Sequence, residues 1–150
     1  MKRIGIYIVI LVALLLAPVQ RADVGKLRPI EVAFVYRSGE QIVLETDTGD
    51  KGVGTTGAEA LQNLKDTTPG IIYLDTAEYL LLTEDAQEAV EQLRPVLKNS
   101  VQICTAETGL DLVLAAQFLP AHGKLPQLKQ WETGTVLPHL TSVEKRLKLS

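Results

Sequence analysis

A glycine-rich segment comes closest to a known chemical motif. Gly52, Gly54 and Gly57 fit the G-x-G-x-x-G fingerprint of dinucleotide-binding loops, and they lie between a predicted strand and a predicted helix. The strand before them alternates polar and apolar residues, whereas a dinucleotide loop follows a buried parallel strand. A capping box made by Thr56 and Glu59 explains the same residues without a ligand. We therefore expect a structural loop and no nucleotide, because the lysine of a phosphate loop is missing as well.

Two aspartates could supply acid–base chemistry. Asp47, Thr48 and Gly49 match the tripeptide of aspartic proteases, in which two carboxyl groups share one proton and activate water. Asp75 begins a possible degenerate second copy, in which Ala77 stands where the tripeptide has glycine. Aspartate and glycine also favour turns after strands, and this is the favoured interpretation. An aspartic-type hydrolase that uses Asp47, with or without Asp75, is the enzymatic alternative.

Cys104, His122 and His139 could form a nucleophile–base set or a metal site. Cys104 lies in an apolar predicted strand, which is typical of a buried and inert thiol. Two histidines do not complete a zinc site. The sequence therefore assigns no catalytic, cofactor-binding or metal-binding residue, and no cofactor is expected.

The elements around these residues alternate between strands and helices. Strands are predicted over 30–36, 41–46, 71–74, 79–82 and 101–105, helices over 58–64, 83–97 and 110–119, and an extended stretch over 140–149. Segment 49–57 is expected to be a loop, Thr83 to cap the helix after it, and the helix over 110–119 to be largely buried. This order predicts an α/β fold, a mixed sheet covered by helices, with α+β possible, preceded by an N-terminal apolar helix.

Length and charge narrow the class of protein. The 150 residues suit one domain, which we assign to residues 23–150, with a less regular tail over 119–150. Lys2, Arg3 and Arg21 belong to residues 1–22, so the body holds 12 basic against 18 acidic residues and a net charge of −6. That balance argues against a nucleic-acid partner, which needs a basic surface.

Residues 1–22 are typical of a signal peptide or a membrane anchor. Residues 4–20 carry no charge and follow Lys2 and Arg3. A small-x-small cleavage site is hard to find, so an uncleaved anchor is the favoured interpretation. Cleavage would instead give a secreted soluble domain. The body is expected to be extracytoplasmic.

The order of these segments resembles a known family. A glycine-containing loop leads into a helix of the type E-A-L-x-x-L over 54–64, followed by a short strand over 72–75 and an apolar run into the next helix over 80–84. Across residues 24–119 this looks like the first domain of the spore germination protein family, the C subunit of germinant receptors. The resemblance implies a membrane-tethered extracytoplasmic α/β domain without enzymatic activity, with partners in a membrane receptor assembly. That family carries a lipid-modified cysteine in its leader, and this leader has none, so the implied tether is the apolar segment itself.

The sequence thus predicts a non-enzymatic binding or structural module with a protein partner in a membrane or envelope assembly. Two surfaces are expected to be most free to contact that partner. One is the tail from His122 onward, and the other is the acidic face of the helix over 83–97, formed by Glu84, Asp85, Glu88 and Glu91.

Overall fold

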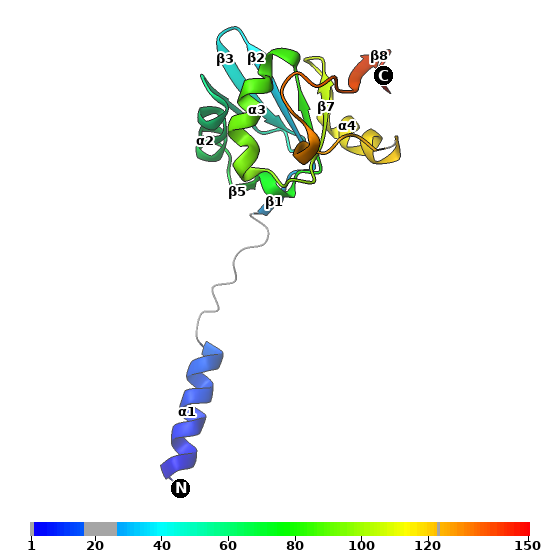
Figure 1. Ribbon diagram of the computed structural model, residues 1–150. Coiled ribbons are helices and arrows are strands. Elements are labelled where there is room, and N and C mark those ends of the chain that lie inside the picture. Colours follow the sequence, from blue (N-terminus) through cyan, green and yellow to red (C-terminus); the bar gives the residue numbers. More distant parts are fainter. Residues whose placement is uncertain (1, 17–26, 123) are drawn as a thin grey trace.

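The computed structural model describes residues 2–16, 27–122 and 124–150, and its body is a mixed sheet covered by helices on both faces (Figure 1). This confirms the predicted α/β class. The strands in chain order are β1 (Leu27–Pro29), β2 (Val32–Ser38), β3 (Gln41–Thr46), β4 (Lys51–Gly54), β5 (Ile71–Tyr73), β6 (Tyr79–Leu82), β7 (Gln102–Ala106), β8 (His139–Val143) and β9 (Arg146–Leu149).

Seven of these strands form one sheet in the order β4-β3-β2-β6-β7-β8-β9. β2, β6, β7 and β8 run parallel to their neighbours in that series, whereas β3, β4 and β9 are antiparallel to theirs. β1 and β5 pair in parallel as a separate two-stranded ribbon.

Four α-helices accompany the strands. They are α1 (Lys2–Leu16), α2 (Gly57–Thr67), α3 (Gln87–Leu93) and α4 (Leu112–Phe118). None of the helices in the described part of the chain combines the length and the apolarity that crossing a membrane requires.

The middle of the sheet is buried on both faces. Ala33 and Val35 of β2 face the core beneath α2 and α3, whereas Val32 and Phe34 face the core beneath α4. All four are at most 1% exposed, as expected for strands with a layer of structure on each side. The hairpin predicted over 30–46 is confirmed as β2 and β3.

Local structure differs from expectation in three segments. Residues 51–54, expected in a loop, form β4 along the edge of β3. The helix predicted over 83–97 is α3 between two 3₁₀ turns, and the Thr83 hydroxyl donates to the Asp85 carboxylate instead of capping it. The extended stretch over 140–149 is a hairpin of β8 and β9. Its two turn residues, Glu144 and Lys145, have φ of 49° and 63°, as a tight type I′ turn requires.

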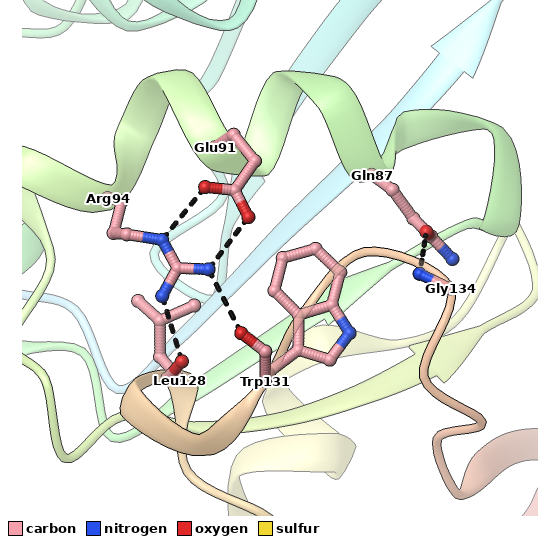
Figure 2. Close-up of polar contacts among 6 residues, drawn as sticks. All are labelled: Gln87, Glu91, Arg94, Leu128, Trp131 and Gly134. Atoms are coloured by element: carbon pink, nitrogen blue, oxygen red, sulfur yellow. Dashed lines mark hydrogen bonds and ion pairs between the residues drawn. The ribbon is translucent and has the colours of Figure 1, made fainter.

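The chain after α4 is held against α3 by Arg94, which directly follows the helix, and by a 3.2 Å hydrogen bond from the Gly134 amide to the side-chain carbonyl of Gln87 (Figure 2). Arg94 donates from Nη1 to the carbonyl of Leu128 at 2.9 Å and from Nη2 to that of Trp131 at 3.2 Å. Glu91 holds the same guanidinium through two hydrogen bonds of 2.9 and 2.7 Å. The guanidinium also lies 5.6 Å from the ring centroid of Trp131. Glu91 and Arg94 thereby direct the tail across α3 toward β8.

We expect Arg94→Met to destabilise the protein by about 1–3 kcal/mol, because two carbonyl groups lose their charged donor. Methionine retains the apolar part of the side chain, so the change reports mainly on the hydrogen bonds. Lys98→Met is the matched control, since it removes an exposed pair with Glu78 and should cost below about 1 kcal/mol. Urea unfolding measures both changes, and equal losses would contradict the fastening function of Arg94.

Candidate functional site

The glycine loop is closed by its own side chains. The Thr56 hydroxyl accepts from the Glu59 amide at 3.2 Å, which confirms the predicted helix cap. The Glu59 carboxylate reaches back one residue further than a standard capping box, and accepts from the Thr55 amide at 2.8 Å. The Thr55 hydroxyl also donates to it, and these bonds lower the pKa of the Glu59 carboxyl. Gly57 N–H donates to the side-chain carbonyl of Gln92 at 2.7 Å.

The glycines themselves allow close packing of backbone on backbone. A Cβ atom on Gly52 would lie 2.1 Å from the carbonyl oxygen of Ala60, and one on Gly57 would lie 2.5 Å from that of Ala89. Gly52 therefore brings β4 against α2, and Gly57 brings α2 against α3. Close packing of these elements therefore explains the glycine spacing that resembles the dinucleotide fingerprint.

A small cavity lies beside this loop, at the start of α2. It measures about 90 Å³ and is lined by side chains that include Arg37, Thr55, Glu88 and Gln92. Ligand pockets usually measure about 300–1,000 Å³, so this cavity is smaller than a dinucleotide site. The expectation that the loop binds no nucleotide stays a prediction.

The two candidate aspartates are in different surroundings. A carboxylate oxygen of Asp47 accepts from the amides of Glu31 and Val32 at 3.2 and 3.3 Å, and so holds the start of β2. Asp75 is exposed in a 3₁₀ turn that begins directly after β5. Within the described ranges no hydrogen bond joins the two carboxyl groups, which an aspartic-type dyad would need.

Cys104 and His139 lie in different environments and form no common site. Cys104 is fully buried in β7, and burial raises the pKa of its thiol to about 12, as predicted for an inert thiol. The Thr105 hydroxyl donates to the Pro138 carbonyl at 3.1 Å, so it accepts from Nδ1 of His139 at 2.9 Å. Among the residues that the structure describes, no group of three or more His, Cys, Asp or Glu side chains could hold a metal ion.

A larger groove lies between α4 and the β8–β9 hairpin, and we term it the hairpin groove. It measures about 350 Å³ and is lined by Leu114, Phe118, His122, Lys145, Arg146 and Leu147. The helix predicted over 110–119 is less buried than expected, because Val113 of α4 is 55% exposed. Only the lining residues from His122 onward belong to the tail that the sequence predicts to be free for a partner, because Leu114 and Phe118 belong to α4.

The hairpin groove combines an apolar floor with a basic rim. The His122 ring stacks on Phe118 with 3.7 Å between centroids, and Nδ1 donates to the Phe118 carbonyl at 2.7 Å. A carbonyl oxygen only accepts, so Nδ1 carries the hydrogen. Lys145 and Arg146 are exposed, and neither takes part in an ion pair within the described residues. Both are therefore available to an acidic partner.

The other predicted surface is partly used within the chain. Glu84, Asp85, Glu88 and Glu91 are all exposed, as expected for a solvated face. Glu91 binds Arg94, and Asp85 accepts from the Thr83 hydroxyl. Sequence reasoning identified the tail but not Leu114, Phe118, Lys145, Arg146 and Leu147 as one surface. The adjacent cations Lys145 and Arg146 were the signal in the sequence that could have indicated this surface.

Comparison with protein-family models, with characterised proteins and with solved structures finds no match to this chain. The fold and the surface chemistry therefore carry the functional argument. They define a mixed α/β domain with carboxylates that cap backbone amides, a buried thiol and an amphipathic groove beside the β8–β9 hairpin.

We expect Thr56→Ala to lower the free energy of unfolding by about 0.5–2 kcal/mol, because the Glu59 amide loses its cap. Thr135→Ala is the control, since that exposed threonine makes only a backbone hydrogen bond within the described residues. Thermal melting measures both variants. In the wild type, a dinucleotide or a nucleoside triphosphate should leave the melting temperature unchanged. A nucleotide shift that Thr56→Ala removes would contradict the structural interpretation of the loop.

Proposed function

We propose that this chain is a non-enzymatic binding module that is anchored in a membrane through residues 4–20, with its body outside the cytoplasm. The uncharged run after Lys2 and Arg3 supports the anchor. The resemblance to the first domain of germinant-receptor C subunits supports a partner within a membrane or spore-envelope assembly. The hairpin groove is the observation that carries the binding function.

The chemistry of the hairpin groove defines the kind of partner. Leu114, Phe118 and Leu147 offer apolar contact, whereas Lys145 and Arg146 add two positive charges at the rim. The body as a whole is acidic, so the charge of this rim is opposite in sign to the net charge of the body. A protein segment with apolar side chains next to carboxylates complements both features.

The free edge of β9 adds a backbone contribution. β9 ends the strand order of the sheet, so one side of its backbone has no neighbouring strand among the described residues. An extended segment could pair with this edge and direct alternate side chains into the adjacent groove. We therefore propose an extended, acidic and apolar segment of a membrane-assembly protein as the occupant.

The first test concerns the anchor. The full chain should remain with membranes after alkaline carbonate washing, because residues 4–20 would be embedded in the apolar core of the bilayer. A fusion of residues 27–150 behind a cleavable export signal is the control and should be released. Recovery of the full chain as a shortened soluble species that begins near residue 23 would contradict anchoring and support the secreted alternative.

The second test concerns the hairpin groove. Arg146→Glu should reduce capture of the partner from detergent-solubilised membranes at least tenfold, because it reverses one charge at the rim. Lys129→Glu is the matched control, since Lys129 is also exposed but lies outside the groove. Quantitative mass spectrometry compares the captured proteins from sporulating and vegetative cells. A set of proteins unaffected by Arg146→Glu would contradict binding at this groove.

A further inference from the structure

A second apolar surface lies on the β1–β5 ribbon. Exposure alternates along β5, since Ile71 is 49% and Tyr73 is 44% exposed, whereas Ile72 between them is 6% exposed. Pro29, the register partner of Tyr73 on β1, is exposed too. Val96, 38% exposed, lines the same groove as Tyr73. We term the four exposed side chains of Pro29, Ile71, Tyr73 and Val96 the ribbon patch.

The groove beside the ribbon patch has a mixed polar rim. It measures about 290 Å³, and its lining includes Leu61, Lys65, Asp75 and Val96. Lys65 is exposed near the end of α2, so its amine can extend away from an apolar layer while its methylene groups stay near it. This arrangement of tyrosine, aliphatic residues and lysine is typical of the interface between lipid tails and headgroups.

The attachment of the chain identifies what this surface faces. Leu27, the first residue of β1, is the register partner of Ile71. Only the 10 residues 17–26 separate Leu27 from the end of α1 at Leu16. A chain of that length spans at most about 40 Å, even when fully extended. If residues 4–20 are in a membrane, the ribbon is the part of the body that is attached to it by the shortest length of chain.

We propose that the ribbon patch rests on the lipid headgroup region of the membrane that holds residues 4–20, with Ile71 and Tyr73 inserted at the boundary of the acyl chains. This inference rests on the proposed anchor and adds an orientation for the body. Because the anchor already confines the body near the membrane, a contact too small for a stable protein–protein interface is sufficient.

A fluorescence experiment tests the contact in the full chain, in vesicles of phosphatidylcholine and phosphatidylglycerol. Tyr73→Cys is labelled with the environment-sensitive dye NBD, and lipids with a nitroxide near the headgroup serve as quenchers. Cys104 needs no replacement, because it is buried and its thiol has a raised pKa of about 12. Val113→Cys is the control, since Val113 is 55% exposed on α4 and belongs to the other face of the sheet.

We expect at least twofold stronger quenching at position 73 than at position 113. Equal quenching at the two positions in vesicle-bound protein would overturn the inference. It would also be overturned if the dye at position 73 were shielded from the lipid nitroxide by a second copy of the chain. Vesicle flotation separates this failure from failure of the anchor, because a chain that does not float contradicts the proposed function itself. Ile71→Cys repeats the measurement independently, and a circular dichroism melt checks that each variant folds.

Discussion

Burial of β2 and β6 on both faces is the constraint on which the rest of this structure depends. Leu80 and Leu82 of β6 share one core with α2 and α3, whereas Leu81 shares the other with α4. Each face therefore needs its own cover. α2 and α3 leave part of the first face open, and the tail after α4 completes it with Leu128, Trp131 and Leu137. Arg94 matters because it binds this late segment through the backbone carbonyl groups of Leu128 and Trp131, and its guanidinium also lies against the Trp131 ring.

The local pattern was sufficient for elements that carry their own signal. The runs that became β2, β3, β5, β6 and β7 are apolar or alternating, and Thr56 with Glu59 marked the start of α2. β4 was missed because its glycines weaken the strand pattern. These glycines are required by the packing of β4 against α2. A Cβ atom added at Gly52 or Gly54 would lie 2.1 or 2.5 Å from atoms of α2. Such a requirement exists only once the helix is packed, so a single sequence does not reveal it.

The candidate site was less predictable than the fold. The β8–β9 turn uses Glu144 and Lys145 at positive φ, where asparagine and glycine are the usual signal. Without that signal the hairpin looked like one extended stretch, and Lys145 and Arg146 were not brought near α4. The position of Phe118 was not predictable either, because its apolar side chain is typical of a buried position. Its ring instead stacks on His122 at the edge of the second core. The hairpin groove arises from contacts between distant segments, which periodicity does not encode.

The parallel strands place the two proposed binding surfaces at opposite ends of the sheet. β1 precedes β2, and β5 precedes β6, so the ribbon lies where these strands begin. β8 pairs with β7 only at Thr105 and Ala106, where β7 ends, so the hairpin lies at the opposite end of the sheet (Figure 1). A strand of five residues advances about 16 Å, which separates the two surfaces by the height of the sheet. If the ribbon patch faces lipid, the same strand direction turns the hairpin groove away from the membrane, where an extended segment of a partner can reach the edge of β9.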